Sequence, residues 1–293
     1  MIVKMIFVKV NSRKKNLTLK TLLQQNLIKC RMAFMKNITE INEQLTKSFK
    51  YILCDVDDTL TVAGKLPFSA YEALWKLKES GFKIILITGG ATGFGETYVR
   101  MWPVDAVISE SGASVNYEEG SLKRIYHPKA KFNTDKRMVN LKNRVLKEVE
   151  GARVAKDQYM RLFDVAFDYA QEEPVLDKSS VNKIKSICEE EKVQYAQSSI
   201  HINTWLGHYS KLEMTRSFLE SHYGWTDKMD EVLYFGDAPN DNPMFGFFRH
   251  CVKVKTNTDY GNLITHLPEF TTKEIGGFGF AEAVTEILQK RNN

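Results

Sequence analysis

Short hydrophobic runs that end abruptly in polar residues recur along the chain after residue 37. Residues 51–56, 82–88 and 106–109 are such runs, and their length and near-continuous hydrophobicity are typical of buried parallel strands. Between them, residues 69–80 carry apolar side chains at helical spacing, and residues 92–101 are also expected to be helical. This alternation of strand and helix predicts an α/β fold with a doubly wound parallel sheet.

The pattern changes over residues 128–206. Amphipathic helices are expected at 135–150 and 179–191, and hydrophobic and polar residues alternate along two strands expected at 160–169 and 199–205. This segment predicts a small α+β domain inserted into the α/β domain.

The α/β pattern resumes with a helix expected at 212–223 and a strand at 231–235. Residues 276–280 are not expected to be a nucleotide-binding loop, because no strand is expected to lead into them, and a turn is expected there before a last helix at 281–291. The chain is therefore expected to comprise a basic N-terminal extension, a core in two segments and an inserted domain: residues 1–47, residues 48–127 with 207–293, and residues 128–206, respectively.

Composition allows a substantial core, since 43% of the 293 residues are hydrophobic. No run approaches the ~18 apolar residues that a membrane-spanning helix needs, so no membrane partner is expected. The net charge of +5 comes from residues 1–34, which carry eight basic residues and no acidic one. The remainder has 33 bases and 36 acids, a net charge of −3, so nucleic-acid binding is not expected.

Residues 1–34 lack the order of a secretory signal peptide. They are expected to be a loosely attached extension, or sequence upstream of a start at Met32 or Met35, and an organelle transit peptide is the alternative. The four cysteines form no CxxC pair, which favours unpaired thiols in a reducing compartment and a cytoplasmic location.

The most informative stretch follows the first expected strand, where Asp55, Asp57 and Asp58 precede Thr59. Burying carboxylates is costly unless a cation or several hydrogen-bond donors compensate. Asp55 and Asp57 are two residues apart, so an extended backbone points both to one side. They predict a metal site, a catalytic site or both, and a capped turn is the alternative for the pair taken alone.

Three further polar sites lie at the ends of expected strands or the starts of expected helices, where open α/β sheets bind ligands. These sites are Thr88 with the two glycines after it, Lys211, and the segment 236–241, Gly-Asp-Ala-Pro-Asn-Asp. Carboxylates from two strands can hold Mg²⁺, and a lysine, a hydroxyl and backbone amides can neutralise a phosphate. One carboxylate can attack phosphorus, and a second can protonate the leaving alcohol and then activate water.

The order Asp-x-Asp-x-Thr, Thr, Lys, Gly-Asp-x-x-Asn-Asp resembles that of the haloacid dehalogenase (HAD) superfamily over residues 50–293. The resemblance implies that Asp55 is the nucleophile and Asp57 the general acid and base. Dehalogenase members lack the second acid, so Asp57 favours phosphoryl transfer.

The same resemblance implies the roles of the other motifs. Phosphate would be bound by Thr88, Gly89, Lys211 and Asn240. Mg²⁺ would be held by Asp55, Asp237 and the main-chain carbonyl of Asp57, with Asp241 behind the metal or against Lys211.

The inserted domain is similar to the type-2 cap of subfamily IIB. That group includes sucrose-phosphate, trehalose-phosphate and mannosyl-3-phosphoglycerate phosphatases, Cof-type sugar phosphatases and phosphomannomutases. Residues 109–113, Ser-Glu-Ser-Gly-Ala, resemble the group's Glu-Asn-Gly-Ala, although Ser111 replaces the common asparagine and weakens assignment to one member.

Two strands of the cap carry candidates for substrate recognition. His201 and Asn203 share one face of an expected strand with the aromatic Trp205, which suits a sugar ring, and Arg161 is a candidate for a second anionic group. The alternative is that this face of the sheet is solvated.

The sequence therefore predicts a Mg²⁺-dependent phosphatase of a small phosphorylated metabolite, a sugar phosphate, acting as a monomer or homodimer. A phosphomutase is the enzymatic alternative, and Arg153, Lys156 and Arg161 are the basic residues that could bind its second phosphate. A non-catalytic phosphate-binding protein is the alternative from another class.

Overall fold

The structure, a computed structural model, describes residues 35–258, 260 and 263–293. The expectations for residues 1–34 lie outside the described residues. The expected extension of residues 1–47 is too long, because the segment after residue 34 belongs to the core. There β1 (Lys36–Asn37) pairs with β13 (Phe270–Ile275), and α2 (Glu43–Ser48) packs against the C-terminal helix.

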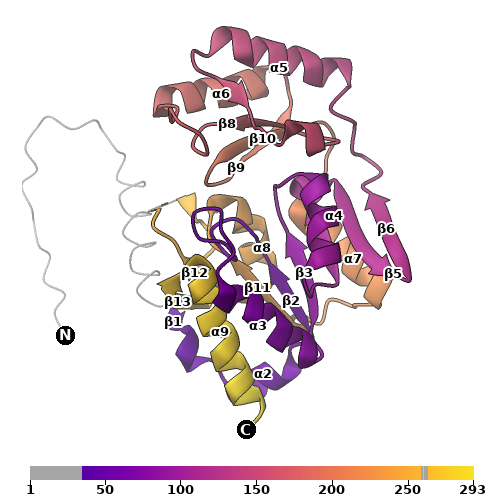
Figure 1. The fold of residues 1–293 in the computed structure, drawn as a ribbon, viewed down its shortest axis with the longest axis vertical. Coiled ribbons are helices and arrows are strands. Elements are labelled where there is room, and N and C mark those ends of the chain that lie inside the picture. The colour runs from indigo at the N-terminus through magenta and orange to yellow at the C-terminus, as the bar shows by residue number, and fades with distance from the viewer. Residues whose placement is uncertain (1–34, 259, 261–262) are drawn as a thin grey trace, which may run out of the picture. The chain divides into compact units, whose positions relative to one another are not determined.

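Among the described residues, nine strands form one sheet in the order β1-β13-β12-β11-β2-β3-β4-β5-β6 (Figure 1). Neighbouring strands from β1 to β4 are parallel, whereas β5 and β6 run antiparallel at one edge. The remaining bounds are β2 (Tyr51–Cys54), β3 (Lys83–Ile87), β4 (Ala106–Ser109), β5 (Ser114–Glu119), β6 (Ser121–Tyr126), β11 (Val232–Gly236) and β12 (His250–Lys255).

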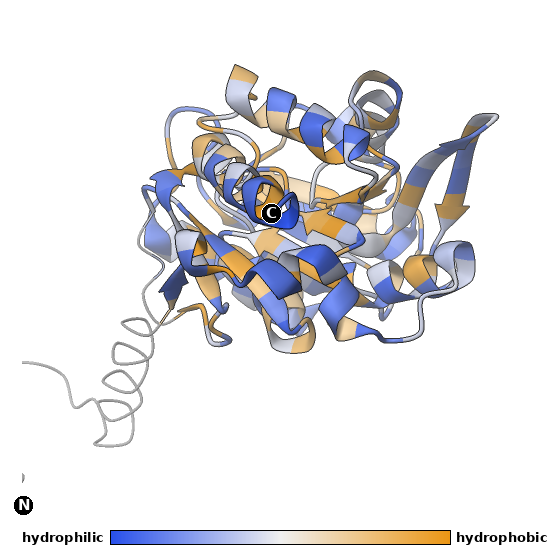
Figure 2. Ribbon diagram, turned by 90° about the horizontal axis from the view of Figure 1, so that it is seen from below, coloured by the Kyte–Doolittle hydropathy of each residue, from blue (hydrophilic) through white to orange (hydrophobic). Residues whose placement is uncertain are grey.

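Helices cover both faces of this sheet, since its central strands are apolar on both sides. Within β3, Ile84 and Leu86 join one hydrophobic cluster and Ile85 and Ile87 join the other. The first cluster includes side chains of α3 (Phe68–Glu79), α4 (Thr92–Met101) and α9 (Gly276–Arg291), and the second those of α7 (Lys211–Tyr223) and α8 (Asn242–Phe247). Figure 2 shows apolar strand segments between helices of mixed polarity. The predicted doubly wound α/β fold is confirmed.

A second, antiparallel sheet of order β7-β8-β10-β9 lies between β6 and α7 in the sequence. Its elements are α5 (Lys136–Glu148), β7 (Arg153–Val154), β8 (Val165–Asp168), α6 (Lys178–Glu190), β9 (Gln194–Gln197) and β10 (His201–Trp205). Val165, Phe167 and Ile202 pack under the two helices, so the alternate residues of β8 and β10 occupy the opposite face. We call residues 128–206 the cap.

Several elements differ from the sequence prediction. The strand expected at 160–169 begins at Val165, because a short 3₁₀ turn and polar contacts of the following residues occupy its first half. Residues 276–280 are the first turns of α9, and β13 leads directly into them. A Cβ on Gly277 would lie 2.3 Å from the Leu60 carbonyl oxygen, so close packing requires glycine there. No helix in the described part of the chain is both long and apolar enough to cross a membrane.

Replacing a fully buried core leucine should destabilise the fold through the cavity that it leaves. Leu77 of α3 is 0% exposed, whereas Met101 of α4 is 67% exposed. We expect Leu77→Ala to lower the free energy of unfolding by about 2–5 kcal/mol, and Met101→Ala by less than about 1 kcal/mol. Urea denaturation followed by circular dichroism measures both, and equal losses would contradict the assigned core.

Candidate active site

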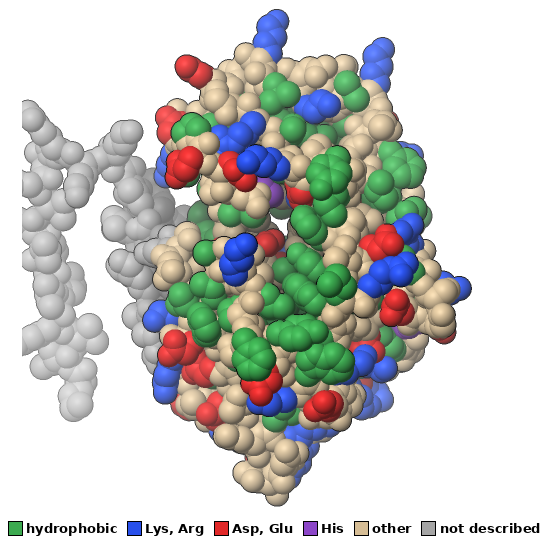
Figure 3. All heavy atoms as spheres, viewed as in Figure 1, with side chains coloured by type: hydrophobic (Ala, Val, Ile, Leu, Met, Phe, Trp, Pro, Cys, Tyr) green, Lys and Arg blue, Asp and Glu red, His purple; other side chains and the backbone are tan. Residues whose placement is uncertain are grey.

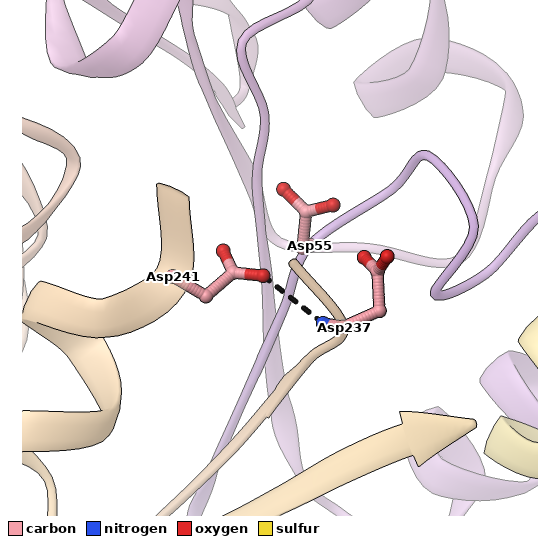
Figure 4. A group of neighbouring side chains, drawn as sticks. All are labelled: Asp55, Asp237 and Asp241. Atoms are coloured by element: carbon pink, nitrogen blue, oxygen red, sulfur yellow. Dashed lines mark hydrogen bonds between the residues drawn. The ribbon is translucent and has the colours of Figure 1, made fainter. Parts of the chain in front are cut away.

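The carboxyl ends of β2 and β11 lie side by side where the strand order reverses. Asp55 directly follows β2, and Asp237 directly follows β11. The two strands pair with Cys54 opposite Phe235, so the two acids meet at the same edge of the sheet. Asp241 lies on the short turn after Asp237. Figure 4 shows the three side chains, and one carboxylate oxygen of each lies within 4.8 Å of the others. The fold thus gathers three buried acids that can hold a metal ion.

Asp241 and Asp237 differ in how fully their oxygens are bonded. The Tyr234 hydroxyl donates to Asp241 Oδ1 at 2.6 Å, and the Asp237 backbone N–H donates to Oδ2 at 3.0 Å. Asp237 accepts the Thr59 hydroxyl at Oδ1 (2.9 Å), but its buried Oδ2 has no partner among the described residues. Such an oxygen is costly, and a cation beside Asp237 and Asp55 would supply the missing partner.

Burial shifts the pKa values of these acids. It raises the pKa of Asp55 to about 8, although Lys211 opposes the shift. Burial, followed by the charges of Asp241 and Asp55, raises the pKa of Asp237 well above its usual range. The cluster is therefore costly in its ionised form, and a bound cation offsets that cost.

Lys211 brings a buried positive charge to the cluster. It begins α7, where the Ser210 side chain caps the helix by accepting the Glu213 N–H at 3.1 Å. Its Nζ lies 2.5 Å from Asp55 Oδ1 and 3.4 Å from Asp241 Oδ1. Burial lowers the pKa of Lys211, but these two carboxylates raise it more, so the ammonium stays charged. Lys211 therefore lies against the carboxylate predicted to attack phosphorus.

A cavity of about 250 Å³ opens beside the cluster. Its lining includes Asp55, Asp57, Thr88, Gly89 and Asn240, so the structure brings together residues from three separate strand ends. In Figure 3 the surface is hollowed between the core and the cap, with hydrophobic side chains along much of the rim.

The residues of this lining carry acid, hydroxyl and amide groups. Asp57 is half-buried, and burial, followed by the charge of Asp58, raises its pKa. The Thr88 hydroxyl accepts the Gly90 N–H at 2.8 Å, which leaves its own hydrogen to donate elsewhere. The buried Oδ1 of Asn240 has no partner among the described residues. The cavity floor thus offers groups that can contact an anion and its leaving group.

The cap forms the opposite wall of the cavity, where His201, Asn203 and Arg161 all lie. All three are buried, so the alternative of a solvated sheet face is wrong. The face is turned toward the core, since Asn203 Nδ2 donates to the Gly89 carbonyl at 2.6 Å. His201 Nε2 is buried without a partner in the described part of the chain, and burial lowers the His201 pKa to about 4, so the ring is neutral near pH 7.

The Arg161 guanidinium donates hydrogen bonds to three other residues. Its Nε and Nη2 donate to Asp157 at 3.1 and 2.8 Å, and its Nη1 donates to the Asp164 oxygens at 3.0 and 2.9 Å. Nη1 also donates to the Gly89 carbonyl at 3.0 Å. Two carboxylates balance its charge, which disfavours the predicted role as a binder of a second anion.

Sequence reasoning missed three residues of this site. Glu110 is fully buried, and its carboxylate accepts backbone N–H groups from Thr92 and from cap residues 162–164 at 2.6–3.0 Å. It directly follows β4, so the signal that identified Asp55, an acid at a strand end, applied to it as well. Phe94 and Tyr98 of α4 line the cavity, but helical aromatic residues carry no such signal.

No protein-family model matches the sequence, and no curated protein matches it at the significance threshold. Solved structures do match. A protein from Thermoplasma acidophilum is 18% identical, with a TM-score of 0.65, over 82% of this chain and 98% of that one. A HAD subclass IIB sugar phosphatase is 15% identical, with a TM-score of 0.57, over 80% and 98%.

A sucrose-phosphatase from Synechocystis, solved with sucrose and phosphate, is 15% identical, with a TM-score of 0.57, over 82% of this chain and 98% of that one. Identities this low establish the fold alone. At that level they agree with the resemblance that the motifs predicted, and the chain has the fold of the HAD superfamily hydrolases, subclass IIB sugar phosphatases among them.

Proposed function

We propose that this protein is a Mg²⁺-dependent phosphatase that hydrolyses a small phosphorylated metabolite, a sugar phosphate, through an aspartyl-phosphate. The observation that carries the proposal is the contact of Asp55 with Lys211 at 2.5 Å. Asp55, but not Lys211, lines the cavity that Asp57 and Thr88 also line. This arrangement supports a nucleophile at Asp55, a proton donor at Asp57 and phosphate-binding groups at Thr88 and Lys211.

The metal site would be made by Asp55, Asp237 and the main-chain carbonyl of Asp57. Carboxylate and carbonyl oxygens suit Mg²⁺, and the unpartnered Oδ2 of Asp237 fits a metal ligand. Asp241 would hold Lys211 and the backbone after β11, since its oxygens are bonded there. When bound, Mg²⁺ would supply positive charge that reduces the repulsion between an anionic nucleophile and an anionic phosphate.

The protein's own residues would carry the bond changes. A carboxylate oxygen of Asp55 attacks phosphorus as the ester P–O bond breaks, and Asp57 gives its proton to the departing alkoxide. Water then attacks the aspartyl-phosphate while Asp57 takes a proton from it, which regenerates Asp55 and releases phosphate. The raised pKa of Asp57 supports the first role, because it favours the protonated form. Lys211 and the Thr88 hydroxyl would neutralise the phosphate oxygens.

The rest of the cavity favours a neutral leaving group. His201 is neutral, and the aromatic rings of Phe94 and Tyr98 offer apolar faces on which a sugar ring can pack. A phosphomutase needs a further cationic site for a second phosphate. Of its candidates, Arg153 is paired with Asp168 at 2.9 Å.

The other two mutase candidates are also paired, Lys156 with Glu172 at 2.7 Å and Arg161 with two aspartates. This supports hydrolysis over phosphoryl transfer within one sugar. The proposal further includes a reducing, cytoplasmic location, in keeping with the free, buried Cys54, Cys188 and Cys251, and a monomer or homodimer.

Removal of the nucleophile should abolish turnover. Wild type should release phosphate from a panel of sugar phosphates with Mg²⁺ and not with EDTA, and Asp55→Asn should lower kcat by on the order of 10³ or more. Asp58→Asn is the matched control; Asp58 has a φ of 59°, which asparagine tolerates, and activity should persist. The proposal fails if wild type releases no phosphate, or if Asp55→Asn stays fully active.

The loss of kcat on removal of the proton donor should depend on the leaving group. We expect Asp57→Asn to lower kcat for a sugar phosphate by about 10²–10⁴, and to lower it much less for p-nitrophenyl phosphate, whose leaving group needs little protonation. Steady-state kinetics on both esters measures the difference. An equal loss on both esters would assign Asp57 to another role.

Metal binding should compete with protons for the acidic cluster. The pKa of Asp55 rises from 3.8 to about 8 on folding without metal, so the metal-free protein loses stability as pH increases through this range. Mg²⁺ stabilises the ionised form, and its effect on the melting temperature should therefore be larger near pH 8 than near pH 6. Thermal melts with MgCl₂ or EDTA test this, and Asp237→Asn should remove the Mg²⁺ effect; equal effects at both pH values would contradict it.

A further inference from the structure

The phosphate-binding loop after β3 is tied to the cap through one backbone carbonyl. Arg161 Nη1 and Asn203 Nδ2, both from the cap, donate to the Gly89 oxygen at 3.0 and 2.6 Å. Asp164 orients both donors, because its carboxylate accepts Arg161 at 2.9 and 3.0 Å and Asn203 at 2.8 Å. The hydrogen-bond donors of these two cap side chains are therefore used to hold the loop.

The Gly89 carbonyl belongs to the same planar peptide as the Gly90 N–H. That N–H donates to the Thr88 hydroxyl oxygen at 2.8 Å. Holding the carbonyl in place therefore holds the N–H, and the N–H fixes the Thr88 hydroxyl with its hydrogen free for an acceptor. A physical chain thus runs from the cap to a hydroxyl that faces the cavity.

The core fixes the same loop from its other side. Glu110 N–H donates to the Gly90 carbonyl at 2.9 Å, and Ser111 N–H donates to the Thr88 carbonyl at 3.3 Å. The Glu110 carboxylate in turn accepts the N–H groups of Leu162, at 2.9 Å, and of the two residues after it. The cap segment that carries Arg161 is therefore anchored to the segment that holds the loop.

From this geometry we infer that Asn203 and Arg161 are positioning residues for the phosphate and do not read the leaving group. Acting through the Gly89–Gly90 peptide, they fix the orientation of the Thr88 hydroxyl. Docking of the cap onto the core therefore raises the affinity for phosphate. The inference rests on the proposed function of the same site. It leaves His201, whose Nε2 has no partner among the described residues, and the other cap residues of the lining, such as Gln171 and Ser199, to face the leaving group.

The inference predicts that loss of the Asn203 side chain lowers activity by the same factor whatever the leaving group of the ester. Asn203→Ala should reduce kcat/KM by the same factor, roughly tenfold, for p-nitrophenyl phosphate, glycerol phosphate and a hexose phosphate, since one hydrogen bond to the loop is lost in each case. It should weaken inorganic phosphate binding by a similar factor. His201→Ala, the matched control, should leave phosphate binding unchanged and alter the ratio between esters. A loss confined to the hexose phosphate, with phosphate binding unchanged, would overturn the inference.

A double-mutant cycle tests whether the effect passes through Thr88. If it does, Asn203→Ala should weaken phosphate binding in the wild-type background and have little further effect in Thr88→Val. Full additivity would overturn the inference. Asn203→Ser serves in the same cycle if the alanine variant does not fold, as judged by circular dichroism.

Calorimetric titration with inorganic phosphate in the presence of MgCl₂ keeps this inference separate from the proposed function, because it needs no turnover. If wild type binds phosphate but hydrolyses no ester, the proposed phosphatase function is wrong. The double-mutant cycle on phosphate binding would then still test the inference. A wild type that does not bind inorganic phosphate at all would overturn the inference.

Discussion

The contact between Lys211 and Asp55 is the interaction on which the rest of the site depends. Three buried carboxylates within 4.8 Å of one another repel, and burial removes the water that would screen them. Lys211 lies between two of these carboxylates, and an oxygen of Asp237 that has no partner in the described part of the chain could bind a further cation. The proposed chemistry uses the same imbalance, because a site with excess negative charge would bind Mg²⁺ and would accept phosphate only once the cation is bound.

The topology of the sheet makes this arrangement possible. Asp55 and Asp237 are far apart in sequence, but β2 and β11 pair in register at the point where the strand order reverses. Because both strands are parallel and end together, their following residues meet. Apolar residues on both faces of these strands hold the sheet rigid between two helical layers, so the acids cannot move apart to relieve their repulsion.

The cap contributes in a way that differs from its sequence pattern. The sequence pattern of its polar residues suited solvent or a sugar, yet Asn203 and Arg161 are bonded to the core through Gly89. Buried polar groups need partners, and here the core backbone supplies them. The neutral His201 and the aromatic residues of α4 also line the cavity, so under the proposed function substrate recognition would be shared between cap and core.

The sequence by itself determined the α/β class, the order of the main strands and helices, and the residues of the core motifs, because apolar periodicity and acids at strand ends are local signals. Asp55 and Asp237 were identified as candidates in this way, and Thr88 and Lys211 by their places at a strand end and before a helix in the motif order. Only the tertiary structure decided which partners these groups have. It shows that residues 35–47 belong to the core and that α9 begins at Gly276. It also shows that two aspartates pair with Arg161, a cation that the sequence predicted to be available to an anion. Those outcomes depend on contacts between segments distant in sequence, and a hydrogen-bond partner across the cavity leaves no mark in the local pattern of residues.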